Sequence, residues 1–264
     1  MFLQPVTTYR KSFTVRSEVE FFYSLVDQFY YFVMVPMLYV AIVIFIVGII
    51  LRMTKMIRRP RQRAITLRVF PEKRSKVLAV LSDIFLFPGV TREKDTAFWV
   101  FFGLFHIAIF LLFLGHLELI ADMKVIQLVK HKIFLGKGLV GFLLIVSLSF
   151  FLFRRFRSPF RELSVPEDFI LILGLLVTAF FGSHMNLATL YSSHGFDIPV
   201  EAYRTYLGSM IRLSPSIPAE ISGSPHQVIL VVHILLANIF FIYFPFSKVM
   251  HSILAFFSNA VKRS

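Results

Sequence analysis

Five predominantly apolar runs, each about 20 residues long, constrain this chain more than any other feature of its sequence. A helix of that length and composition crosses the hydrocarbon core of a bilayer. The runs cover residues 30–51, 97–120, 134–153, 169–190 and 228–246. Only 16% of the 264 residues are charged, whereas about a quarter are charged in a soluble domain. The sequence therefore predicts an all-α integral membrane protein, folded as a five-transmembrane-helix bundle.

Lys and Arg gather between these runs and predict how the bundle is oriented. Nineteen fall on one side of the membrane and nine on the other, and twelve of the nineteen lie in residues 52–97 alone. Basic loops stay in the cytoplasm, so we expect the N-terminus on the outer side of the cell membrane and the C-terminus on the cytoplasmic side. The net charge of +13 thus reflects membrane topology rather than nucleic-acid binding.

This topology divides a single membrane domain, residues 1–264, into spans and connecting segments. We expect residues 1–29 to form an external N-terminal segment, residues 52–97 a basic cytoplasmic loop, and residues 187–225 an external cap with a short helix over residues 200–213.

The chain contains no cysteine. Disulfides, thiolate metal sites and iron–sulfur clusters within this chain are therefore excluded. Any cofactor has to be held by histidine, methionine or carboxylate side chains.

Four histidines lie where antiparallel spans could bring them together. His106 and His116 belong to the second span, His233 belongs to the fifth, and His251 follows shortly after the end of the fifth. His116 could then face His233 near the outer side, and His106 could face His251 near the inner side. Two opposed imidazoles suit a haem iron with two axial histidines, so the pattern predicts two haem groups. The unequal spacings, about 15 Å and 27 Å of helix rise, require tilt or a bend near Pro245.

Histidines inside a membrane have other uses, and the residues alone leave these open. An imidazole in a span can hydrogen-bond a backbone carbonyl or line a path for protons or ions. No carboxylate lies in the middle of a span, where a proton relay would use one; Glu118 and Asp122 lie at the outer end of the second span. A haem-free transporter of protons or metal ions, and a structural membrane anchor, are the alternatives.

Two segments carry a resemblance to a known family. "FHIAIFLLFLGH" (residues 105–116) and "HILLANIFFIYFPFSKVMH" (residues 233–251) resemble the gamma subunit of respiratory nitrate reductase, as does "RRFRSPFRELSVPEDFILILGLL" before the fourth span. The same family of di-haem b membrane cytochromes includes those associated with sulfite reductase and heterodisulfide reductase. The resemblance covers about residues 28–258.

The resemblance implies an electron-transfer subunit of a respiratory complex, without a catalytic residue of its own. Two haem b groups would be held by His116 with His233 (outer) and by His106 with His251 (inner). A quinol, expected to be menaquinol, would be oxidised near the outer haem. An iron–sulfur subunit, resembling that of heterodisulfide reductase or the nitrate reductase beta subunit, would dock on the cytoplasmic face. The long basic loop favours the heterodisulfide-reductase type.

The resemblance also implies residues for the quinone. The family has a functional lysine in the loop between the second and third spans, where this chain has Lys130 and Lys132. Gly115, beside His116, would let a quinone ring approach closely. The alternatives are a solvated lysine and a glycine that serves helix packing.

Overall fold

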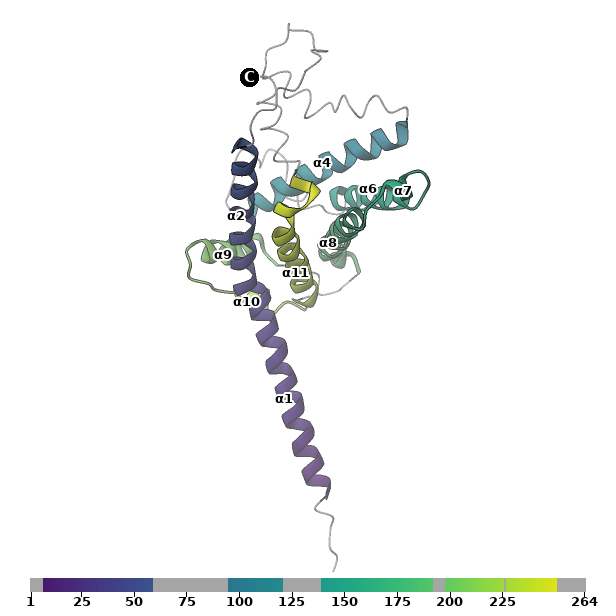
Figure 1. Ribbon diagram of the computed structural model, residues 1–264. Helices are drawn as coiled ribbons and strands as arrows, with labels where there is room; N and C mark the ends of the chain where they lie inside the picture. Colours follow the sequence, from purple (N-terminus) through teal and green to yellow (C-terminus); the bar gives the residue numbers. More distant parts are fainter. Residues whose placement is uncertain (1–6, 59–94, 121–138, 192–197, 226, 251–264) are drawn as a thin grey trace, which may run out of the picture.

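A computed structural model describes residues 7–58, 95–120, 139–191, 198–225 and 227–250. Every regular element in these ranges is a helix (Figure 1). The long helices are α1 (Thr7–Met34), α2 (Pro36–Arg58), α4 (Thr96–Glu118), α6 (Leu139–Arg155), α8 (Pro166–Tyr191) and α11 (Gln227–Tyr243). The shorter elements are α7 (Phe160–Leu163), α9 (Val200–Ile211), α10 (Ala219–Ser222) and two 3-10 turns, η2 (Phe244–Phe246) and η3 (Lys248–Met250).

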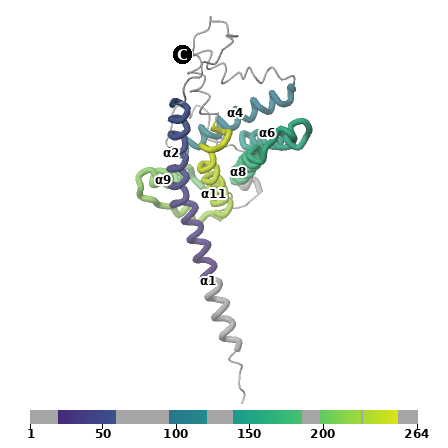
Figure 2. The backbone as a smooth tube through the Cα atoms, viewed as in Figure 1, coloured from purple at the N-terminus to yellow at the C-terminus, as the bar shows by residue number. Residues whose placement is uncertain are grey.

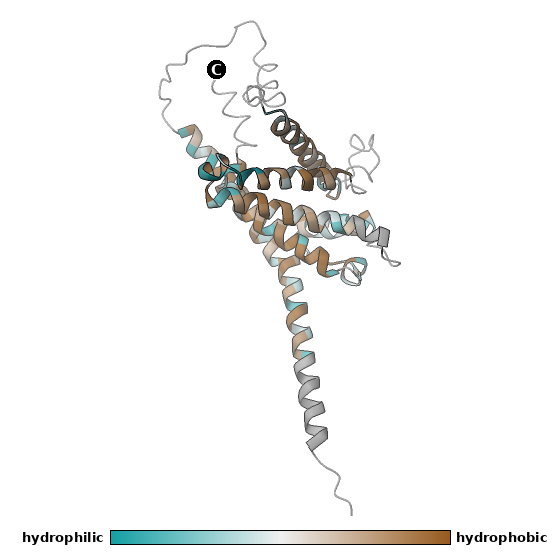
Figure 3. Ribbon diagram, turned by 90° about the vertical axis from the view of Figure 1, so that its right-hand side faces the viewer, coloured by the Kyte–Doolittle hydropathy of each residue, from teal (hydrophilic) through white to brown (hydrophobic). Residues whose placement is uncertain are grey.

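Four helical stretches in the described residues are long and apolar enough to cross a membrane. They are Glu20–Arg58, Thr96–Glu118, Pro166–Met185 and Gln227–Phe246. Between 6% and 28% of each apolar window is buried inside the chain, so most apolar side chains face outward, as lipid contact requires. Figure 3 shows the same pattern, with apolar residues along the helices and hydrophilic residues mainly near their ends. The prediction of an all-α membrane protein is confirmed.

The third predicted span, residues 134–153, coincides with α6 and is not among these four stretches. Its described part has 17 residues, and the preceding residues 121–138 lie outside the described ranges. A fifth crossing and the direction of the termini therefore stay predictions. The same holds for most of the basic loop, since residues 59–94 are also outside the described part.

The helices pack in a defined order. Helix α4 packs against α6, α6 against α8, α8 against α11, and α11 against α2. A Cβ added to Gly141 of α6 would lie within 2.2 Å of the Ser183 hydroxyl of α8, so this glycine permits close approach of the two helices. The described part of α1 continues from α2 and extends away from the other helices (Figure 2).

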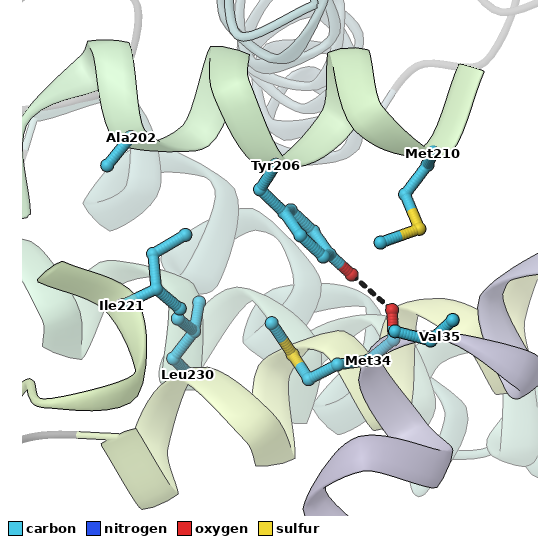
Figure 4. Packing of buried hydrophobic residues seen from close by; sticks show 7 residues of the cluster. All are labelled: Met34, Val35, Ala202, Tyr206, Met210, Ile221 and Leu230. Carbon is cyan, nitrogen blue, oxygen red and sulfur yellow. Dashed lines mark hydrogen bonds between the residues drawn. The ribbon is translucent and has the colours of Figure 1, made fainter. Parts of the chain in front are cut away.

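The boundary between α1 and α2 is tied to the cap and to α11. Pro36 has no N–H and interrupts the helical hydrogen-bond ladder. The carbonyl of Val33 instead accepts a hydrogen bond from the Asn238 side chain, 3.0 Å away, and the carbonyl of Met34 accepts one from the Tyr206 hydroxyl (Figure 4). Burial raises the pKa of Tyr206, so its hydroxyl keeps the proton that it donates. Helix α9, which carries Tyr206, confirms the short helix predicted within the cap.

We predict that Tyr206→Phe lowers the stability of the protein by about 1–3 kcal/mol, because it leaves the buried Met34 carbonyl without its donor. Thermal unfolding in detergent measures the effect. Tyr23→Phe is the matched control, since Tyr23 is 63% exposed on α1. Equal unfolding temperatures for the two variants would contradict this role for Tyr206.

Candidate functional site

His116 of α4 and His233 of α11 face each other. Their ring centroids are 6.4 Å apart and their planes are inclined by 29°. His116 lies in the last turn of α4 and is exposed, while His233 is half-buried. Helices α4 and α11 are not among the helix pairs that pack closely along their lengths. The two imidazoles therefore meet across a separation that the backbones do not close.

In both rings Nε2 can serve as a ligand, because Nδ1 is already hydrogen-bonded to a backbone carbonyl. His116 Nδ1 lies 2.7 Å from the Leu112 carbonyl, and His233 Nδ1 lies 3.1 Å from the Thr178 carbonyl of α8. A carbonyl only accepts, so Nδ1 carries the proton in both rings and Nε2 keeps its lone pair. Metal-ligating histidines commonly show this arrangement, which fixes the ring and raises its basicity.

The distance between the rings fits a single iron between them. An imidazole nitrogen lies about 2 Å from a bound metal, and the ring centre lies about 1 Å beyond that nitrogen. Two imidazoles on opposite sides of one ion thus have centroids about 6 Å apart. The observed 6.4 Å is close to this value, so His116 and His233 are the residues that would hold a haem iron here.

Helix α8 supplies space for the His233 ring. A Cβ added to Gly182 would lie 2.9 Å from Cε1 and 3.2 Å from Nδ1 of His233. Thr178, whose carbonyl binds Nδ1, precedes Gly182 by one helical turn. The same face of α8 therefore both holds the ring and makes room for it.

The remaining predicted site residues are only partly placed. His106 is half-buried in α4, its Nδ1 is 2.8 Å from the Phe102 carbonyl, and its ring lies 4.2 Å from that of Phe102. Its expected partner, His251, lies outside the described residues, as do Lys130 and Lys132. Gly115 is buried in α4. The roles of all these residues as ligands or quinone contacts stay predictions.

No three His, Cys, Asp or Glu side chains gather as ligands of one metal ion in the part of the chain that the structure describes. A haem iron takes only two axial ligands from the protein, so the His116–His233 pair meets its requirement without a third residue.

The sequence did not reveal an ion pair next to His116. Glu118, the last residue of α4, is 1% exposed. Arg204 of α9 donates from Nε to the Glu118 carbonyl at 3.1 Å, and its Nη2 lies 3.9 Å from the Glu118 carboxylate. The only sign of this pair in the sequence was a carboxylate at the end of an apolar run. Its partner could not be recognised, because Arg204 lies 86 residues away in the chain. This pair joins the cap to the end of α4.

Comparison with known proteins places the chain in a family. Residues 95–262 match the family model described as the nitrate reductase gamma subunit. The chain belongs to this family. The matched region contains all four predicted haem ligands, His106, His116, His233 and His251. The resemblance inferred from the two histidine segments is therefore confirmed at the level of the family.

The chain is also similar to a curated protein. The "Hdr-like menaquinol oxidoreductase cytochrome b-like subunit" of Archaeoglobus fulgidus is 27% identical over 200 residues. The alignment covers 68% of this chain and 58% of the relative. This chain thus matches somewhat more than half of the relative's length.

We predict that Gly182→Ala weakens haem retention by about tenfold, because a displaced His233 ring loses its alignment with His116. The haem-to-protein ratio of the purified protein measures the effect. Gly174→Ala on the same helix is the control, since a Cβ there meets no atom within 4 Å. Wild-type haem content in the Gly182 variant would show that this glycine does not set the ring position.

Proposed function

We propose that this chain is the membrane cytochrome b subunit of a respiratory quinol-oxidising complex. In this proposal it carries two haem b groups and passes electrons between a quinol near the outer face of the cell membrane and an iron–sulfur subunit on the cytoplasmic face. The observation that carries the proposal is the His116–His233 pair. Its spacing of 6.4 Å and its two anchored Nδ1 atoms meet the needs of a haem iron.

In this proposal the residues of this chain would hold and orient the haem. His116 and His233 would hold one group, and His106 and His251 would hold the other. When bound, haem iron accepts and gives up single electrons, a chemistry that side chains do not supply. The carbonyls of Leu112 and Thr178 fix the two rings of the first pair. The second pair follows from family membership and from the sequence.

A quinol is the substrate that best suits the end of α4. The named relative is a menaquinol oxidoreductase subunit, which supports menaquinol here. Gly115, next to His116, and a lysine at 130 or 132 are the residues that we propose to contact it. Oxidation of a quinol there releases two protons, and the predicted orientation places their release outside the cell.

The partner subunit is proposed from the relative's name and from the charge of residues 52–97. The relative's name places it in an Hdr-like complex, and the twelve basic residues in 52–97 give the cytoplasmic side a strong positive charge. We therefore propose a heterodisulfide-reductase-like iron–sulfur subunit rather than a nitrate-reductase-beta-like one. An acidic surface on that subunit would be attracted to this loop.

The proposal predicts that His116→Ala and His233→Ala each remove one b-type haem and leave the other. Loss of one axial imidazole opens the site, whereas the inner site keeps both of its ligands. Difference spectra of dithionite-reduced against oxidised membranes, with the haem-to-protein ratio, measure this. His184→Ala is the control, because His184 stacks on Phe180 of its own helix and is not a proposed ligand.

Two outcomes would contradict the proposal at different levels. Retention of both haems in either variant would refute the ligand pair. Absence of haem bands from the wild-type protein would refute the cytochrome itself, and would favour a histidine-lined transporter or a structural anchor.

A further inference from the structure

The turn that ends the fifth span is held on several sides. After α11 ends at Tyr243, the chain forms η2 (Phe244–Phe246) and η3 (Lys248–Met250). Met250 is 1% exposed and is joined by one peptide bond to His251. What fixes this turn therefore fixes the residue to which His251 is bonded.

Helix α2 holds the first half of the turn. A Cβ added to Gly48 would lie 2.6 Å from the Pro245 Cβ, so the ring of Pro245 packs directly on the backbone of α2. One helical turn later, Arg52 donates from Nη1 to the Pro245 carbonyl at 3.1 Å. These contacts fix the start of the turn against α2.

Helix α8 holds the second half through its first turn. Asp168 is 7% exposed, and its Oδ1 accepts a hydrogen bond from Lys248 Nζ at 2.8 Å. Its Oδ2 accepts from Arg155 Nη1 of α6 at 3.0 Å and from the Val165 N–H at 3.2 Å. Glu167 Oε1 accepts from the Lys248 N–H at 3.2 Å. Both the backbone and the side chain of Lys248 are thus anchored to α8.

Ser247 closes the turn internally. It is 1% exposed. Its hydroxyl donates to the Phe244 carbonyl at 2.9 Å and accepts from the Val249 N–H at 3.2 Å. Residues 244–250 are thus held by contacts to α2 on one side and to α8 on the other.

Asp168 is the buried member of this cluster, whereas 55% of the Lys248 side chain is exposed. An exposed pair contributes about 1 kcal/mol or less, whereas a buried carboxylate without partners is strongly destabilising. Asp168 joins three segments that are distant in the sequence, namely the end of α6, the start of α8 and η3. Of these, only η3 leads directly to a proposed haem ligand.

We propose that Asp168 is a positioning residue for His251, acting through Lys248. The carboxylate fixes Lys248, and Lys248 fixes the direction in which the chain continues to His251, three residues later. This inference rests on the proposed function, in which His251 holds the inner haem.

The first test compares haem content in Asp168→Asn and wild type in the full chain. Asp168→Asn is expected to weaken retention of the inner haem by about tenfold, as loss of a supporting contact commonly does, and to keep the outer haem. His251→Ala and His116→Ala provide the reference spectra and midpoint potentials for proteins that lack one haem. Glu162→Gln is the matched control, because Glu162 is half-exposed and 3.9 Å from Arg161.

The second test needs no haem. Since the chain has no cysteine, His251→Cys gives a unique position for a nitroxide spin label. The label is expected to be immobile on the wild-type background and mobile when combined with Asp168→Asn. Combination with Glu162→Gln should leave it immobile. If Asp168→Asn does not accumulate, Lys248→Met replaces it, because that variant leaves the Arg155–Asp168 pair intact.

The outcomes separate the two proposals. Selective loss of the inner haem together with increased label mobility supports the positioning role. Unchanged haem and mobility, or equal loss of both haems, overturns it, since Asp168 then either does nothing or stabilises the whole fold. Absence of haem from the wild-type protein would instead refute the proposed function.

Discussion

The separation of two imidazole rings on α4 and α11 is the constraint on which the site depends. The rings are held 6.4 Å apart, and neither helix packs closely along the other. Helix α8 sets the position of one ring through the Thr178 carbonyl and the absence of a side chain at Gly182. Helix α6 packs between α4 and α8 and so sets the position of α4, which bears His116. The fold thus positions two donors without closing the space between them.

Polar contacts in this apolar chain are concentrated where helices end. Glu118 and Arg204 tie the cap to the end of α4, two residues after His116. Asp168 and Lys248 tie α8 to the turn that precedes His251. Glu118 and Asp168 are buried carboxylates, which are costly unless paired, so each pair fixes how two distant segments meet. Apolar surface specifies insertion into the membrane, while these few contacts specify how the helices are arranged.

Much of the fold follows from the sequence because apolarity and helical period are local properties. The spans over residues 97–120 and 228–246 and the helix within the cap were predicted close to their observed bounds. The bend expected near Pro245 appears as the end of α11 at Tyr243, followed by η2. Helix α1 was not predicted, because its mixed composition gives no apolar run before residue 30. Gly182 could not be recognised, since its importance depends on a ring 51 positions away in the chain.

A density map of the protein, purified in lipid and without added cofactor, tests the central claim most directly. The account predicts a flat, strong density between His116 and His233, with the Nε2 atoms of both rings directed at its centre. Rings that close on each other with nothing between them, or a density held by other side chains, would contradict it.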